Sequence, residues 1–121
     1  MSKAYEFLRE CGAFFVLTNN GDFPAGRPFG AVMEEDGDLF IATNDMGQTH
    51  KQLRISGNMQ IVAKKEGSRE WIRITGVAAE CKDEELQQKM FDTCPVLYRI
   101  YPDSREHFLL FRVKVLDVEV K

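Results

Sequence analysis

The feature that most constrains the fold is a succession of short apolar runs, each closed by a strong turn signal. Residues 13–18, 39–43 and 59–63 are rich in β-branched and aromatic side chains, while residues 19–22 and 35–38 favour tight turns. Short strands joined by tight turns pair antiparallel with their neighbours. We therefore expect the first three strands, 13–18, about 27–34 and 39–43, to form an antiparallel meander.

Three further strands follow, at residues 59–63, 70 to about 81, and 108 to the C-terminus, which makes six in all. Pro24 and Gly26 are expected to keep the residues before the second strand irregular. Along the last strand the apolar residues change phase between Val115 and Leu116 without a turn. Such a change predicts a β-bulge or a strong bend.

Three helices are expected between these strands. The first covers residues 2–11 and ends at Gly12, and the last begins after Asp83 and ends at Cys94. The middle helix begins near Thr49. There Thr49 and Gln52 have the spacing of a capping box, in which the Gln52 side chain returns to the Thr49 backbone N–H.

Composition excludes several classes of function. A chain of 121 residues is predicted to form one domain, 1–121, with a core of its own. A net charge of −3 gives no electrostatic support for a nucleic-acid partner, and no apolar run approaches the roughly 20 residues of a membrane helix. Three widely spaced cysteines favour free thiols in a reducing, cytoplasmic compartment. Two histidines and no paired cysteines predict no metal site.

Two segments carry chemistry. Residues 26–32 place an Arg-Pro pair at the start of the second strand, and residues 48–53 open the middle helix with polar and cationic side chains. A helix start with free backbone N–H groups, a hydroxyl and a lysine suits a phosphate. Because Arg27 can face the same spot, the sequence predicts a phosphorylated flat cofactor lying across a small β-barrel.

These segments resemble the FMN-binding split-barrel family of pyridoxamine 5′-phosphate oxidase-like proteins. The resemblance covers nearly the whole chain, is closest to the short branch related to nitroimidazole-resistance flavoproteins, and is carried by residues 5–8, 27–32, 39–43, 50–53 and 71–76. It implies a mainly β fold with flanking helices, a six-stranded antiparallel split β-barrel. It also implies a homodimer that holds FMN in clefts between two identical subunits.

The resemblance also implies the cofactor-binding residues. The second strand contributes Arg27, Pro28, Phe29 and Gly30, and the third strand contributes its last residues, Ala42 and Thr43. The phosphate is implied to lie by Gln48, Thr49, His50 or Lys51, with Gln52 nearby, and Trp71 is implied to approach the flavin across the subunit interface.

Some features depart from the full oxidases. Gln48 and Thr49 stand where those enzymes often have two cations, so we expect weaker phosphate binding and a larger role for Lys51. The triplet 105–107 echoes an Arg-x-His substrate motif but is too short to be specific, and the long C-terminal extension is missing. True pyridoxamine phosphate oxidation is therefore not expected.

Simpler interpretations of the same residues stay open. Arg27 can be a surface charge, and Thr49 with Gln52 can cap the helix without any phosphate. His50 can be solvated, and Trp71 can be a core residue or a dimer anchor. Tyr101 can line a pocket, but we expect it to pack in the core.

The resemblance implies an FMN-dependent oxidoreductase with an unknown small-molecule substrate. No side chain has the pattern of a general acid or base, so the catalytic residues are unknown. One alternative is a non-catalytic flavin-binding or sensing protein. Another is a split barrel that binds deazaflavin or haem, for which His50 or His107 would have to serve as the iron ligand.

Overall fold

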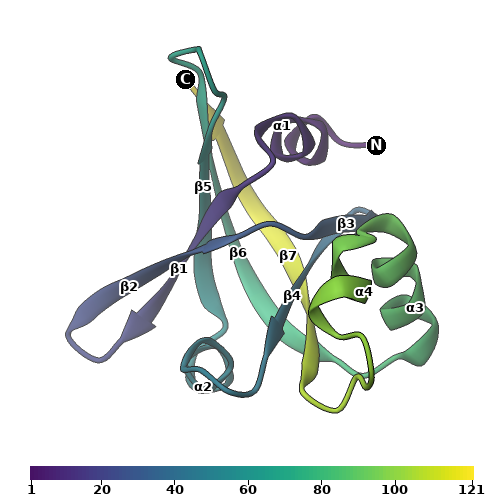
Figure 1. The fold of residues 1–121 in the computed structure, drawn as a ribbon. Helices are drawn as coiled ribbons and strands as arrows, with labels where there is room; N and C mark the ends of the chain where they lie inside the picture. The colour runs from purple at the N-terminus through teal and green to yellow at the C-terminus, as the bar shows by residue number, and fades with distance from the viewer.

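The computed structural model describes all 121 residues, as seven strands and four helices (Figure 1). The strands are β1 (Phe14–Asn20), β2 (Phe23–Phe29), β3 (Val32–Glu35), β4 (Asp38–Asn44), β5 (Asn58–Lys64), β6 (Trp71–Cys81) and β7 (Phe108–Val120). The helices are α1 (Lys3–Cys11), α2 (Thr49–Ile55), α3 (Glu84–Thr93) and α4 (Val96–Ile100).

All strands pair antiparallel in one sheet of order β2-β1-β5-β6-β7-β4-β3. Its two edge strands, β2 and β3, are consecutive in the chain and separated only by Gly30 and Ala31. The chain therefore joins the two edges of the sheet, and the barrel is split at this joint (Figure 1). The mainly β split barrel expected from the sequence is confirmed.

The expected second strand, 27–34, is two strands in the structure. β2 pairs with β1, and β3 pairs with β4, so both pairings of the predicted meander are present. The strand breaks at Gly30 because the chain leaves one sheet edge there and crosses to the other. The prediction that Pro24 and Gly26 are irregular is wrong, since both lie within β2. β2 is an edge strand, where a missing N–H is tolerated.

The predicted bulge in the last strand is confirmed. Thr75 of β6 lies opposite Asp117, and the next residue, Gly76, lies opposite Val115. Leu116 is thus the extra residue on β7. The bulge bends the strand where β7 passes from β6 toward β4.

The first and third helices follow the prediction. The Ser2 side chain accepts a hydrogen bond from the Tyr5 N–H, and Gly12 ends α1 with a φ of 78°. The Asp83 carboxylate caps α3 by accepting from two backbone N–H groups, and α3 ends before Cys94.

The capping box predicted for the middle helix is wrong. Gln48, not Thr49, precedes α2, and no side chain caps the helix. The Gln52 side chain is buried and bonds to Thr18 and Arg27 in the barrel wall instead. A tertiary contact thus replaces the local one. The short helix α4, which begins after Pro95, was not expected.

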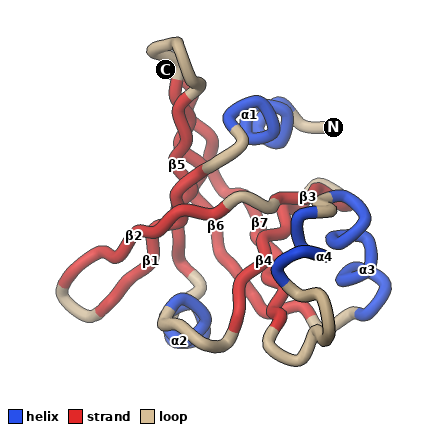
Figure 2. Tube along the Cα trace, in the orientation of Figure 1, coloured by secondary structure: helices blue, strands red, loops and turns tan.

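Two hydrophobic clusters hold the molecule together. The larger one fills the barrel and includes Phe14, Ile74 and Phe111. The smaller one lies between the barrel and the helices α3 and α4, and includes Phe40 and Phe91. Figure 2 shows these helices side by side against β3, β4 and β7. β3, the middle of β4 and the first residues of β7 are therefore buried, whereas the second half of β7 is exposed.

The outer face of β1, β5 and β6, together with the bulge of β7, has no such cover. Phe15 is 52% exposed, Val77 is 39% exposed and Leu116 is 60% exposed. The helices of this protein lack the length and apolar character needed to cross a bilayer.

Candidate functional site

A cavity of about 450 Å³ lies beside the split in the barrel. Its wall is built by the joint between β2 and β3, the end of β4, the start of α2, and α4. Seven of the residues expected from the sequence line it together: Arg27, Pro28, Phe29, Gly30, Ala42, Thr43 and Thr49.

The other expected residues do not line this cavity within one chain. Gln48, which precedes α2, and Lys51, in its first turn, are exposed to solvent. His50 is only 4% exposed, and its Nδ1 atom has no hydrogen-bond partner, so the solvated alternative for this residue is wrong. Gln52 is 8% exposed and lies behind Arg27.

Trp71 lies at the beginning of β6, where it pairs with Lys64. Its ring is half-buried, and the Arg73 guanidinium lies 5.0 Å from the ring centre. Trp71 can meet the cavity only if a second copy of the chain brings it there, as the resemblance implies.

Arg27 is the one cation in the cavity wall, and a network of hydrogen bonds fixes its position. Its Nη1 atom donates to the Thr18 hydroxyl at 2.7 Å and to the Val16 carbonyl at 3.3 Å. Its Nη2 atom donates to Gln52 Oε1 at 2.8 Å, and the Thr18 hydroxyl donates to the same oxygen. The protein therefore holds Arg27 in place, and its contact with a cofactor stays a prediction.

No carboxylate balances this guanidinium. Every acceptor that Arg27 contacts is neutral, and it takes part in none of the ion pairs in the structure. Partial burial lowers the pKa of Arg27 from its usual value. A partly desolvated, unpaired cation favours an anion as its partner.

The opposite wall of the cavity is apolar and comes from α4 and the residue that follows it. Val96, Leu97 and Ile100 line this side. Tyr101 donates its hydroxyl to the Thr43 carbonyl at 3.2 Å and packs edge-on against Phe108, with ring centres 5.4 Å apart. Both interpretations of Tyr101 hold, because it packs against the smaller core cluster and also lines the cavity.

The loop between β4 and α2, at the mouth of the cavity, is tied to the start of β7. Asp45 Oδ1 lies 2.9 Å from His107 Nδ1, and the Asp45 backbone N–H donates to the His107 carbonyl at 3.1 Å. The Met46 N–H also donates to the Asn44 side chain. His107 therefore helps to hold this loop against the residue that precedes β7.

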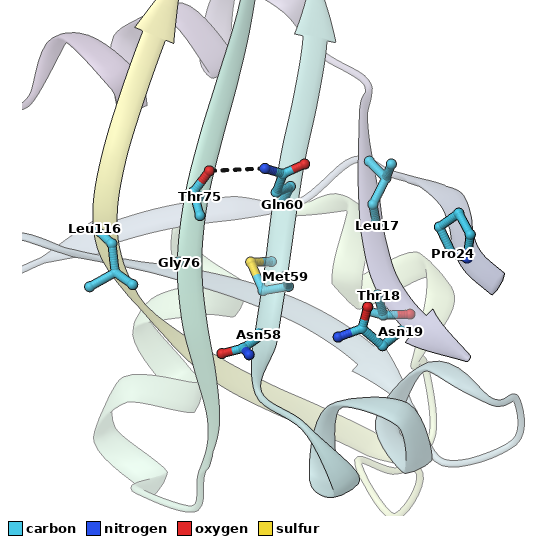
Figure 3. Close-up of a pocket in the computed structure, with 10 residues that line it drawn as sticks. All are labelled: Leu17, Thr18, Asn19, Pro24, Asn58, Met59, Gln60, Thr75, Gly76 and Leu116. Atoms are coloured by element: carbon cyan, nitrogen blue, oxygen red, sulfur yellow. Dashed lines mark hydrogen bonds between the residues drawn. The ribbon is translucent and has the colours of Figure 1, made fainter. Parts of the chain in front are cut away.

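A second hollow, of about 440 Å³, lies on the bare outer face. Figure 3 shows that it runs across β1, β5, β6 and β7, with Leu17, Gln60, Thr75 and Leu116 around it. The Gln60 side chain donates to the Thr75 hydroxyl at 3.1 Å. No charged side chain lines this groove.

Comparison with known proteins decides the family. Residues 2–120 match the family model described as pyridoxamine 5′-phosphate oxidase. The chain belongs to the pyridoxamine 5′-phosphate oxidase family. The resemblance noted from the sequence is thereby confirmed. No curated protein sequence matches the chain.

Solved structures agree with this assignment to the family. A NimC/NimA family protein from Clostridium acetobutylicum has 30% sequence identity and a TM-score of 0.85, over 98% of this chain and 91% of that one. An FAD-binding protein from Mesorhizobium loti has 14% identity and a TM-score of 0.75, over 99% of this chain and 94% of that one. A heme-binding protein from Mycobacterium smegmatis has 16% identity and a TM-score of 0.74, over 100% of this chain and 55% of that one. The last two show likeness of fold alone.

Proposed function

We propose that this family member is an FMN-binding oxidoreductase that acts on a small molecule. The observation that carries the proposal is Arg27, an unpaired and partly buried cation in the wall of a 450 Å³ cavity. The phosphate of FMN would give this cation the charge partner that the protein does not supply. Membership of the pyridoxamine 5′-phosphate oxidase family supports a flavin as the ligand.

The backbone at the barrel split fits the polar edge of a flavin ring. Strand pairing stops at Phe29 and resumes at Val32, so Gly30 and Ala31 have no partner strand. A Cβ atom at Gly30 would meet nothing within 4 Å, which means that the space beside it is open. Unpaired backbone groups next to open space can bond a ring's carbonyl and imide groups.

When bound, FMN supplies hydride transfer at its N5 atom, and the chemistry belongs to the cofactor. This chain's residues would bind and orient it. The fixed Arg27 charge stabilises negative charge in the cavity, and the apolar side chains of α4 exclude water from the opposite side. The structure adds no side chain with the geometry of a general acid or base, so we name no catalytic residue.

Two measurements test the proposal. Freshly purified protein should show flavin absorbance, or bind added FMN with quenching of flavin fluorescence. It should then oxidise NADH or NADPH when a second electron acceptor is present. Absence of FMN binding would overturn the proposal. Binding without turnover would favour the non-catalytic flavin-binding or sensing alternative.

FAD, deazaflavin and haem are the competing cofactors. Neither His50 nor His107 lines the cavity, which disfavours haem held by a histidine. Reconstitution with haem tests that alternative, because a histidine ligand would give a Soret band shifted from that of free haem. Mass spectrometry of the ligand released from purified protein distinguishes FMN from FAD and from deazaflavin.

We also propose a homodimer formed through the bare outer face. This face carries Phe15, Val77 and Leu116 at substantial exposure and is the one broad sheet face that α3 and α4 leave uncovered. Burial of such side chains drives association. A second copy seated there would bring new side chains, among which the resemblance implies Trp71, toward the flavin.

The three free cysteines fit a cytoplasmic location.

A further inference from the structure

Gln52 is a buried amide that lies behind Arg27 and bonds to it. Gln52 is 8% exposed and is absent from the cavity wall, so its side chain faces Arg27 and Thr18 rather than a ligand. Its Oε1 atom accepts from both of these residues. Thr18, 3% exposed, completes a closed ring of three hydrogen bonds.

This ring determines which N–H groups of Arg27 remain available. A guanidinium carries five N–H donors. Nη1 serves two protein acceptors and Nη2 serves one, which leaves the Nε–H group and one N–H of Nη2 without a protein partner. Two neighbouring free donors match two oxygens of a phosphate or carboxylate.

Because residue 52 is a glutamine and not a glutamate, the positive charge of Arg27 also stays unpaired. A glutamate at position 52 would accept the same two hydrogen bonds with almost the same shape. It would, however, place a carboxylate 2.8 Å from Nη2 and neutralise the guanidinium. A glutamine holds the arginine in place while leaving its positive charge for a ligand.

We propose that Gln52 is a positioning residue that, together with Thr18, presents Arg27 as an uncompensated cation and so makes the cavity select flavins that carry a phosphate. This inference rests on the proposed function and deepens it. It assigns Gln52 to the orientation and charge of Arg27, not to direct contact with the cofactor.

The test compares the affinities for FMN and for riboflavin, which lacks the phosphate, by quenching of flavin fluorescence. The wild-type protein should prefer FMN by about 10- to 100-fold, the range of a charge-assisted contact. Gln52→Glu should lose most of that preference, because FMN binds more weakly while riboflavin affinity stays the same. A merely structural role of Gln52 would weaken the binding of both flavins equally.

The matched control is Gln87→Glu, at a half-buried position on α3 outside the cavity wall. It changes the net charge by the same amount and should keep the wild-type preference. Thermal unfolding of the ligand-free variants checks folding, and Gln52→Glu should melt no lower than the wild type, since it gains an ion pair with Arg27.

Two outcomes would overturn the role of Gln52, and a third would overturn FMN binding itself. An unchanged FMN preference in Gln52→Glu would overturn the inference and leave FMN binding intact. Equal wild-type affinity for the two flavins would also overturn it, whereas binding of neither flavin would overturn the proposed function itself. Should Gln52→Glu not fold, Thr18→Val removes one member of the ring at nearly constant volume. A full FMN preference in that variant would equally refute the positioning role.

Discussion

At the residue scale, Arg27 and Lys51 are the two cations that the sequence assigns to the phosphate, and the structure places them differently. Arg27 is fixed in the cavity wall, whereas Lys51 is exposed on α2 and has no bonded partner. Arg27→Ala should weaken FMN binding by about 1–3 kcal/mol, because a charge-assisted contact is lost. Lys51→Ala should cost less, because solvent screens an exposed charge.

Fluorescence titration with FMN at two salt concentrations measures both effects. The Lys51→Ala loss should shrink at high salt, and the Arg27→Ala loss should persist. An Arg27→Ala variant with wild-type affinity would mean that the phosphate binds elsewhere.

Tyr101 gives a prediction about pH. Burial raises the pKa of its hydroxyl above the usual value of 10.0, although the nearby Asn44 side chain partly offsets this. The folded state therefore holds the proton more tightly than the unfolded state. The stabilisation is complete below about pH 10 and is lost as the pH rises through the higher pKa of the folded protein.

Tyr101→Phe should flatten this alkaline loss of stability. At neutral pH the variant should be less stable by about 1 kcal/mol, because the Thr43 carbonyl loses its hydrogen bond. Urea unfolding at neutral pH and near pH 10.5 measures both changes. An equal alkaline loss in the variant and the wild type would assign the effect to another group.

At the element scale, the close pairing of β6 with β7 at the bulge depends on Gly76. A Cβ atom at this position would lie 2.7 Å from the Lys114 carbonyl oxygen and 2.8 Å from Val113 Cγ1. Gly76→Ala should therefore destabilise the fold by about 1–3 kcal/mol, since backbone must move to make room. The midpoint of urea unfolding reports this change.

Gly26→Ala, in β2, is the matched control. Its Cβ atom would meet only the Leu17 side chain at 3.6 Å, an ordinary contact distance. We expect a change of less than about 0.5 kcal/mol, which an exposed position typically gives. If both variants unfold at the same urea concentration, close packing at the bulge is not what requires glycine at position 76.

At the scale of the whole molecule, the sheet face that no helix covers predicts where the two subunits of a homodimer meet. Leu116→Lys puts a charge on the bulge of β7, beside the groove of the outer face. The variant should elute with the 13.9 kDa mass of one chain, and the wild type with twice that mass. Light scattering after gel filtration measures this, and FMN affinity should fall together with the dimer.

Gln87→Lys, on the α3 side of the molecule, is the control and should remain a dimer. A wild-type protein that is monomeric at micromolar concentration would refute the proposed assembly. A dimeric Leu116→Lys variant would place the interface on another face.

The sequence determined the parts of this protein that depend on local preferences. Turn residues at 19–22 and 35–38 and the apolar alternation of the strands set the hairpins. The phase change at Val115 set the bulge, and Ser2 and Asp83 set two helix starts. The motif around Arg27 also located one wall of the cavity, because neighbouring residues on a strand end necessarily lie together.

Only the tertiary structure decided which distant groups meet. It turned Gln52 from a helix cap into the partner of Arg27, buried His50, and placed α4 as the far wall of the cavity. The reason is energetic: an amide gains as much from a local backbone bond as from a barrel partner, so spacing alone does not select between them. Burial against residues far away in the sequence makes that selection.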